Sequence, residues 1–376
     1  MPSEVAYLVK GHAEVRRILQ NEATFRRAGA DGIDHFPSTA ATVAAMDGDE
    51  LRRMRGLLGN AFAPARMARV RRAVEALTDQ LVRDMFADGT ADAVEMLALP
   101  LTLQVIGEIM GIPPADRLRF AGWGDRYLSI HPDTSDADSR SAVEEMVAYM
   151  GEHIADRLAH PDRPSDVLGA IAVNGAALIA AEPGDAHDLQ VRIALFAATL
   201  VVAGWETTAA ILSSSLLRLL TAHNADGQLL YQELVDHPTR IATAVEEMLR
   251  TIPVSMLDST LPRRAVSDTE LAGVRIPAGS LVLPGTDLGN RDPDAFPEPN
   301  RIDFQRRGAN RHLAFGAGPH FCLGAPLARL ELNVALETLV RLVPDLELGQ
   351  PPETVLFSAA TTIRRPKSLL IRRPSP

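Results

Sequence analysis

Cysteine is almost absent from the 376 residues, because the chain contains only Cys322. A single cysteine excludes an internal disulfide and a cysteine-rich zinc site, and it is typical of a reducing, intracellular setting. Lysine is also scarce and occurs only as Lys10 and Lys367, so nearly all basic residues are arginine. We interpret this bias as the codon composition of a GC-rich bacterial genome.

Long hydrophobic runs and targeting signals are missing as well. The longest apolar run, Ile193 to Trp205, is bounded by charged residues and is shorter than the ~20 residues that a membrane span needs. The N-terminus shows no basic region followed by an apolar core, so we expect no signal peptide. A net charge of −10 argues against nucleic-acid binding. The sequence thus predicts a soluble, cytoplasmic protein without a nucleic-acid or membrane partner.

Most of the chain has the apolar spacing of α-helices, and its 46% hydrophobic and 23% charged residues are typical of a globular protein. No repeat or linker divides the sequence, so we expect one domain over residues 1–376, mainly α with small β-sheets. The expected helices are 52–63, 70–85, 101–110, 142–158, 190–222, 241–251 and 325–342. The expected strands are 5–9, 271–284 with a turn at 277–279, and 361–371.

The single cysteine lies in the stretch FGAGPHFCLG, Phe315 to Gly324, directly before a predicted helix. Gly316 and Gly318 allow a positive φ or a close approach of the backbone to a large flat ligand. Free N–H groups and the helix dipole favour a thiolate at this place, which makes Cys322 a candidate nucleophile or metal ligand. A small buried hydrophobic cysteine is the commonest alternative. A cysteine hydrolase would also need a base, which nothing in the sequence clearly nominates.

The pattern F-G-x-G-x-H-x-C-x-G in this stretch resembles the haem-binding signature of the cytochromes P450, and it matches at every fixed position. The resemblance implies the cytochrome P450 fold, with haem b (iron protoporphyrin IX) between a long oxygen-binding helix and the helix after the cysteine. It implies that Cys322 is the axial thiolate ligand of the iron, which favours O–O cleavage. Phe315 would pack against the haem, and His320 would donate to a propionate. Gly316 and Gly324 would make room for the porphyrin.

The apolar run leads into AGWETT, Ala203 to Thr208. A glycine in mid-helix costs ~1 kcal/mol relative to alanine. Thr207 can donate back to the Ala203 carbonyl and loosen the helix, or the segment is a buried helix with a packing notch. The stretch resembles A-G-x-[DE]-T, the oxygen-binding motif of the same family. The resemblance places Ala203 and Gly204 at the cofactor. It assigns Glu206 and Thr207 to the acid–alcohol pair that relays protons to dioxygen, the co-substrate.

Glu247 and Arg250, spaced i and i+3 on one helix, would alone be an ordinary surface pair. Their place between the two motifs resembles the family's E-x-x-R, whose third partner comes from an irregular stretch before the cysteine loop. Residues 290–310 form such a stretch, which is rich in proline, asparagine and charge and has no period. Arg301 is the best match within it, so we expect a structural triad of Glu247, Arg250 and Arg301.

Haem carries two propionates, so further cationic partners are expected. Arg263 and Arg55 stand where the family places them. The segment around Arg55 departs from the family's D-P-P-x-H-x-x-x-R, because Leu51 replaces the histidine and one propionate contact is missing from the motif. Residues 5–27 resemble the strand and helix that follow an N-terminal helix and sheet in the family, so we expect either an N-terminal segment shorter than usual or a start that was misassigned or trimmed.

The motifs stand in the family's order along nearly the whole chain. They predict a bacterial haem-thiolate monooxygenase that hydroxylates or otherwise oxidises a hydrophobic small molecule, such as a natural product. Oxidative aryl coupling, epoxidation, a peroxide-driven peroxygenase and a non-catalytic haem-thiolate protein are the alternatives, and the acid–alcohol pair favours catalysis with dioxygen. No flavin or iron–sulfur segment is visible, so we expect a separate ferredoxin and its reductase. Arg52, Arg53 and Arg329 are candidates for the ferredoxin surface.

Other interpretations of these residues fail. The glycines of the cysteine loop lack the third glycine and the βαβ context of a dinucleotide fingerprint, and no histidines have the His-Glu-x-x-His spacing of a zinc hydrolase. From family position we expect a substrate pocket of mostly small apolar residues. The segments expected to line it are 28–46, 123–139, Leu200, Ala203, 254–257 and 357–360.

Overall fold

The computed structural model describes residues 6–28, 43–62, 64–86, 89–129, 136–160, 162, 166–254, 262–358 and 361–374. Most of this part of the chain is helical, as the apolar spacing predicted. The helices are α1 (His12–Gln20), α2 (Gly48–Gly56), α3 (Pro64–Met85), η3 (Val94–Ala98), α4 (Leu99–Met110), α5 (Arg117–Leu128), α6 (Asp136–Ala159), α7 (Val167–Ala181), α8 (Ala186–Leu219), α9 (Leu230–Asp236), α10 (Ile241–Thr251), α11 (Thr286–Gly289), η8 (Gly318–His320) and α12 (Ala325–Leu342). The strands are β1 (Ala6–Val9), β2 (Phe25–Arg27), β3 (Thr90–Asp92), β4 (Arg263–Ala265), β5 (Thr269–Leu271), β6 (Val274–Ile276), β7 (Leu281–Pro284), β8 (Glu347–Leu348) and β9 (Leu370–Arg372).

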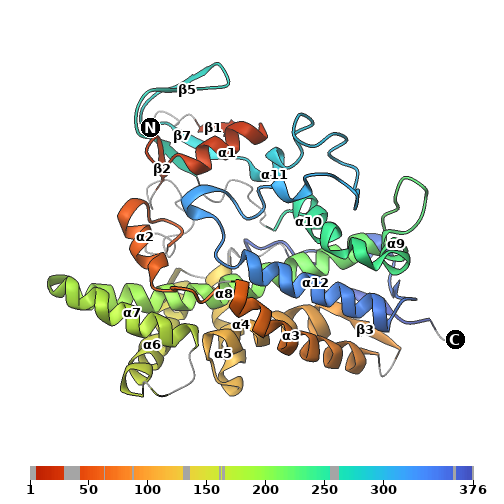
Figure 1. Ribbon diagram of the computed structural model, residues 1–376, viewed down its shortest axis with the longest axis horizontal. Coiled ribbons are helices and arrows are strands. Elements are labelled where there is room, and N and C mark those ends of the chain that lie inside the picture. Colours follow the sequence, from red (N-terminus) through yellow and green to blue (C-terminus); the bar gives the residue numbers. More distant parts are fainter. Residues whose placement is uncertain are drawn as a thin grey trace.

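The 34-residue helix α8 runs through the centre of the molecule (Figure 1). Its sequence contains no proline and is apolar on nearly every side, which is the pattern of a fully buried helix. Helices α4, α6, α7 and α12 all pack against it. By length and composition α8 could cross a membrane, but 72% of its most apolar window is buried inside the fold. It is therefore the core helix around which the others are arranged.

Helix ends follow the signals in the sequence. The predicted helices 241–251 and 325–342 are confirmed at both ends as α10 and α12. Pro326 opens α12, where its missing N–H costs nothing. Asp166 caps α7 by accepting a hydrogen bond from the Gly169 N–H at 2.6 Å. Gly111 ends α4 in the left-handed conformation, with φ of 83°.

Other expected elements differ from the structure. The expected helix 52–63 starts earlier, as α2, and ends at Gly56, whereas α5 and α7 were not predicted. Ala272 and Gly273 form a two-residue turn, both with positive φ, so β6 pairs with β5 in a hairpin of its own. Within the expected strand 361–371, β9 is the only named strand among the described residues.

A four-stranded sheet, in the order β1-β7-β4-β2, lies with α1 and α11 at the end of the molecule opposite the long helices (Figure 1). β1 pairs with β7 in parallel, and the other pairs are antiparallel. The register places Arg27 of β2 directly opposite Arg263 of β4. Two like charges in this position destabilise a strand pair, so a compensating anion is expected nearby.

The stretch between α11 and α12 is irregular, as predicted, and it packs through its own side chains. Phe296 and Phe304 are buried within it. Phe296 contacts the His12 ring edge-on at 5.4 Å, and the Arg250 guanidinium lies 5.1 Å from its centroid. The stretch therefore bridges α1 and α10.

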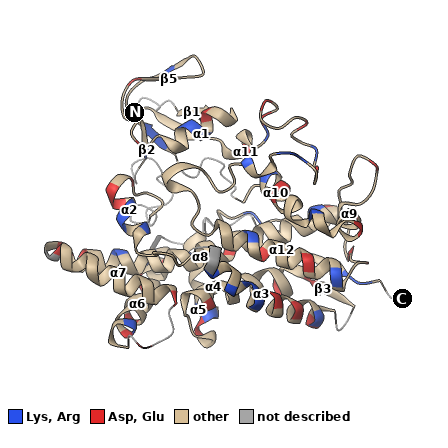
Figure 2. Ribbon diagram, in the orientation of Figure 1, with Lys and Arg blue, Asp and Glu red and all other residues tan. Residues whose placement is uncertain are grey.

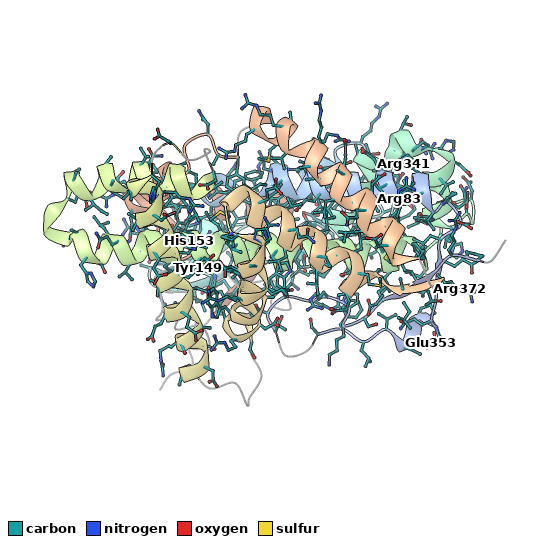
Figure 3. The ribbon with its side chains drawn as sticks, turned by 90° about the horizontal axis from the view of Figure 1, so that it is seen from below. Arg83, Tyr149, His153, Arg341, Glu353 and Arg372 are labelled. Carbon is teal, nitrogen blue, oxygen red and sulfur yellow. The ribbon has the colours of Figure 1, made fainter. Side chains whose placement is uncertain are left out.

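Helices α3 and α12 lie side by side, and α12 also packs against α8. Charged residues line the outer surface of this pair (Figure 2). Asp79 of α3 forms ion pairs with Arg83, at 3.6 Å, and with Arg341 of α12, and both arginines are labelled in Figure 3. These exposed pairs contribute little to stability, so the apolar contact beneath them holds α12 in place.

Candidate active site

The cysteine loop, residues 315–324, contains η8 and leads directly into α12. The Cys322 N–H donates to the Phe315 carbonyl at 2.9 Å, which closes the loop. Gly316 and Gly318 have φ of 69° and 70°, where a side chain is strained. A Cβ on Gly318 would also lie 2.5 Å from the Leu19 carbonyl oxygen of α1. Of the two predicted reasons for these glycines, the structure shows the positive φ.

Cys322 is exposed to solvent. The protein around it raises the pKa of the thiol, whereas the Gly324 and Ala325 N–H groups, Arg55 and Arg329 act in the opposite direction. A Cβ on Gly324 would meet the sulfur at an ordinary 3.9 Å. Burial thus disfavours a bare thiolate, and its surroundings favour one that is paired with a cation. This combination suits a metal ligand.

Basic side chains gather beside the loop. His320 Nε2 lies 3.0 Å from Asp47 Oδ1 and 3.4 Å from Arg27 Nε. Hydrogen bonds from His320 and the Arg27 N–H lower the pKa of Asp47 although burial opposes them. Burial lowers the pKa of Arg263 to about 10 and also lowers those of Arg27 and His320. The guanidinium groups of Arg27 and Arg263 and the ring of His320 thus place hydrogen-bond donors and positive charge beside the loop, which suits an anionic ligand.

Arg55 of α2, which the resemblance assigns to a haem propionate, donates to the Phe321 carbonyl of the cysteine loop at 2.9 Å. Leu51, one turn earlier, is fully buried in the main core. The histidine that the family pattern has at this place is therefore replaced by a core residue. Arg27 and Asp47 were missed as partners of His320. Arg27 lies outside every motif, and Asp47 is the first residue of the segment that contains Leu51 and Arg55, but no role was assigned to it.

A second cluster, formed by polar and charged side chains, connects the cysteine loop with α10. Glu246 of α10 accepts hydrogen bonds from Arg329 Nε at 2.6 Å and from His312 Nε2 at 3.2 Å. Although burial opposes them, these bonds lower the pKa of Glu246 to about 2. The Arg329 guanidinium also stacks on the Phe315 ring at 4.6 Å. Glu246 thus ties both ends of the cysteine loop to α10.

The expected triad is correct in two members and wrong in the third. Glu247 and Arg250 are fully buried and make two hydrogen bonds of 2.8 Å. The third member is Arg306, whose Nε donates to Glu247 Oε1 at 3.0 Å. Arg301 instead pairs its side chain with Glu298 and Asp303 and contributes only its carbonyl oxygen to the cluster. The irregular stretch is rich in arginine, and its motif alone did not distinguish them.

On α8, Thr207 Oγ1 donates to the Ala203 carbonyl at 2.5 Å, as predicted from the residues. The expected loosening is wrong, because α8 stays α-helical from end to end. Ala203 is nevertheless exposed on a helix that is mostly buried, so it borders an open space. The missing side chain of Gly204 faces α4, since a Cβ there would lie 2.9 Å from Ile106 Cδ1. Gly204 therefore serves helix packing.

Glu206 is buried, and its carboxylate does not face water. Arg365 Nε donates to Glu206 Oε2 at 3.1 Å. Burial raises the pKa of Glu206, and Arg365 acts in the opposite direction. Arg365 lies outside every motif, so its contact with Glu206 was not predicted from the sequence.

Known proteins resemble this chain in sequence and in structure. The family model for cytochrome P450 matches residues 176–342. The mycinamicin IV hydroxylase/epoxidase of Micromonospora griseorubida is 36% identical over 97% of this chain and 89% of its own. The chain belongs to the cytochrome P450 family. A P450 structure with biaryl coupling reactivity has a TM-score of 0.84 at 32% identity, covering 97% of this chain and 89% of that one. A P450 hydroxylase of the leinamycin pathway of Streptomyces atroolivaceus has 0.83 at 34%, with the same coverage.

The P450 family uses haem with a cysteine thiolate ligand and dioxygen, and the chain is a P450 monooxygenase. The observed residues fit this cofactor. Cys322 offers an accessible sulfur at a helix N-terminus, which suits iron. Arg27 and Arg263 supply positive charge, and the His320 ring supplies a further hydrogen-bonding group, for the two propionates.

The structure describes parts of the expected surroundings of the P450 site. Trp123, the first residue of the expected lining segment 123–139, is buried against Phe120 at 4.9 Å and donates to Glu145 at 2.8 Å. Parts of the other expected lining segments, at 29–42, 130–135, 255–257 and 359–360, lie outside the described residues. The three arginines expected at the ferredoxin surface all have carboxylate partners, namely Asp49 and Glu22 for Arg52, Glu182 for Arg53 and Glu246 for Arg329.

Proposed function

We propose that this P450 oxidises a hydrophobic small molecule of natural-product metabolism in the bacterial cytoplasm, as a single haem-thiolate domain over residues 1–376. The observation that supports this most is Cys322, held by backbone N–H groups at the start of α12. Several relatives are named for reactions on natural products, among them a nocardicin C N-oxygenase and an erythromycin C-12 hydroxylase. Hydroxylation is the proposed outcome, with epoxidation and aryl coupling as the alternatives.

Residues on two sides would hold the cofactor, haem b. Cys322 would ligate the iron, and Phe315, Gly316 and Gly324 belong to the loop that carries it. The haem supplies the oxidising chemistry when bound. Arg263 and His320 would bind the propionates, and we add Arg27 to this set because it lies 3.4 Å from His320. Arg55, whose donor group points at the cysteine loop, would steady that loop and carry further positive charge.

On the other side, α8 would supply space and protons. The small Ala203 is exposed, so dioxygen and substrate can approach the helix there. Thr207 would donate its hydroxyl proton toward dioxygen and recover it from Glu206, whose burial keeps it ready to bind a proton. This acid–alcohol pair distinguishes a monooxygenase from an electron carrier, which needs no proton relay.

The test combines spectra and turnover. The reduced haem protein under carbon monoxide should show the red-shifted Soret band of thiolate ligation, and a small-molecule library should contain compounds that give a type I spectral shift. With such a compound, Thr207→Ala should form product roughly 100-fold more slowly, whereas Thr208→Ala, a buried neighbour, should change it little. Equal rates for the Thr207→Ala variant and the wild type would contradict the relay. Turnover that peroxide alone sustains would indicate a peroxygenase.

We further propose that a separate acidic ferredoxin, reduced by its reductase, docks at α1. Arg16 and Arg17 are exposed there, and Arg311 joins them around an open cavity of about 420 Å³. Helix α1 contacts η8, so this surface adjoins the cysteine loop. Arg16→Glu and Arg17→Glu should raise the KM for the ferredoxin at least several-fold and leave the carbon monoxide spectrum unchanged. Arg53→Ala is the control, since Arg53 is paired with Glu182. An unchanged KM would contradict this docking site.

A further inference from the structure

The acid of the α8 pair has a charged partner from the far end of the chain. Arg365 lies 159 residues after Glu206, and the two side chains are 18% and 6% exposed. A charge-assisted hydrogen bond of 3.1 Å with so little water around it holds a carboxylate in one orientation. Thr207 meanwhile donates to the Ala203 carbonyl. In this arrangement, the acid is bound to Arg365 while the alcohol is bound to its own helix.

Arg365 is itself fixed by a folded segment that we call the C-terminal turn, residues 356–358 and 361–367. The Ser358 N–H donates to the Arg365 carbonyl at 2.8 Å, and the Arg365 N–H donates back to Ser358 Oγ at 3.2 Å. Phe357 and Pro366 form a bridge beside them. The Lys367 N–H closes the turn by donating to the Leu356 carbonyl at 2.8 Å. The backbone that carries Arg365 is therefore held in place as part of this turn.

The same turn contacts two other segments that were expected to line the substrate pocket. The Thr362 N–H donates to the Leu128 carbonyl at the end of α5, at 3.2 Å. The Arg364 N–H donates to the Val254 carbonyl at 2.7 Å. The guanidinium of Arg364 stacks on the Phe357 ring at 4.5 Å, whereas that of Arg365 binds Glu206. The C-terminal turn thus connects the pocket segments with Glu206.

Among the charged groups around Glu206, Arg365 is the one that favours its ionised form. After burial itself, Asp125 of α5 and Glu95 of η3 also raise the pKa of Glu206. Arg365 is the group that lowers it, through its charge and its hydrogen bond. Burial likewise raises the pKa of Asp125, and Arg365 lowers it. Both acids therefore depend on the same guanidinium for their ionised form.

We propose that Arg365 is a positioning residue of the proton relay, which holds the Glu206 carboxylate and couples it to the C-terminal turn. This proposal rests on the proposed function, because it takes Glu206 and Thr207 as the relay. Displacement of the turn withdraws the guanidinium, and the freed Glu206 then binds a proton in its buried site. The turn and the relay acid thereby influence each other in both directions.

The first test is an infrared pH titration of the haem-loaded protein. The C=O stretch of protonated Glu206 is identified by its loss in Glu206→Gln. In Arg365→Gln this band should persist to higher pH than in the wild type, because a nearby cation has been removed. Arg365→Lys should restore most of the wild-type titration. Arg364→Gln is the matched control in the same turn and should leave the band unchanged. An identical titration in Arg365→Gln and the wild type would overturn the proposal.

The second test uses hydrogen exchange and requires no turnover. Glu206→Gln should speed amide exchange in residues 361–367 roughly 10-fold, because the charged hydrogen bond to the turn is lost. Glu95→Gln, which changes an exposed acid near Glu206, should leave that exchange unchanged. Unaltered exchange in Glu206→Gln would refute the coupling to the turn. The proposed function is tested by a different variant. If the proposed function is wrong, Thr207→Ala should turn over like the wild type, whatever the exchange in residues 361–367.

Discussion

The two sides of the site differ in how they are held. The cysteine side, residues 315–329, is fixed by its own backbone and by Glu246, which accepts hydrogen bonds from Arg329 and His312. The α8 side, residues 203–207, is held through Glu206 by one guanidinium from a distant turn. A ligand to a metal must not move, whereas a proton relay has to change partners. The difference in construction matches this difference in task.

The largest change to the cysteine side is the loss of its sulfur. In Cys322→Ala the reduced protein under carbon monoxide should lose the red-shifted Soret band, and product formation should fall to background, because no other thiol exists in the chain. Circular dichroism should show the helix content of the wild type, which separates lost ligation from unfolding. A retained red-shifted band would contradict the assignment of the ligand.

The buried ion cluster beneath the cysteine side provides the next largest effect. Arg306→Ala leaves the fully buried Glu247 short of one partner and should lower the free energy of unfolding by about 3–5 kcal/mol. Arg301→Ala removes only exposed pairs and should cost about 1 kcal/mol or less. Denaturant unfolding of both variants measures the difference. Similar losses in the two variants would mean that the assignment of Arg306 to the triad is wrong.

The pH dependence of stability should reveal Glu246. Its pKa is about 2 in the folded protein, below the ordinary 4.5, so its contribution is present above about pH 4.5 and disappears as the pH falls toward 2. The change amounts to about 3 kcal/mol. Glu246→Gln should flatten the stability profile in this window, as measured by urea unfolding at several pH values. Glu337→Gln, which changes a more exposed acid on α12, should keep the wild-type slope.

The smallest effect concerns the packing of α8. Gly204→Ala places a Cβ 2.9 Å from Ile106 Cδ1, so overpacking should destabilise the protein by about 1–2 kcal/mol despite the higher helix propensity of alanine. In an Ile106→Ala background the space is free. The same substitution should then stabilise the protein by up to about 1 kcal/mol. A double-mutant cycle measures this reversal, and equal effects in both backgrounds would show that Gly204 does not serve the α4 contact.

The sequence allowed most helices and the motif-borne residues to be predicted, because helix period and fixed spacing are local properties. Cys322, Thr207 and the pair of Glu247 with Arg250 lie where their patterns indicated. Residues that reach the site from segments distant in sequence were harder to predict. Arg306 was confused with a neighbouring arginine, and nothing local distinguishes the two before the stretch folds.

Arg27 and Arg365 were missed for the same physical reason. Arg27 reaches His320 only through the pairing of β2 with β4, and Arg365 reaches Glu206 only when the C-terminal turn closes on α8. Both are ordinary arginines in an arginine-rich chain, so their residue type carries little information. Long-range register and burial decide their roles, and these are not visible in a single motif.

Cys322 is the only thiol of the chain and is exposed, so its chemical labelling can report how many molecules lack haem. A maleimide can attach at one atom of the chain, so a single mass increment would count empty molecules, and incorporation of haem would block the increment. The raised pKa of the free thiol slows this labelling near neutral pH, and a mildly alkaline pulse would sharpen the count.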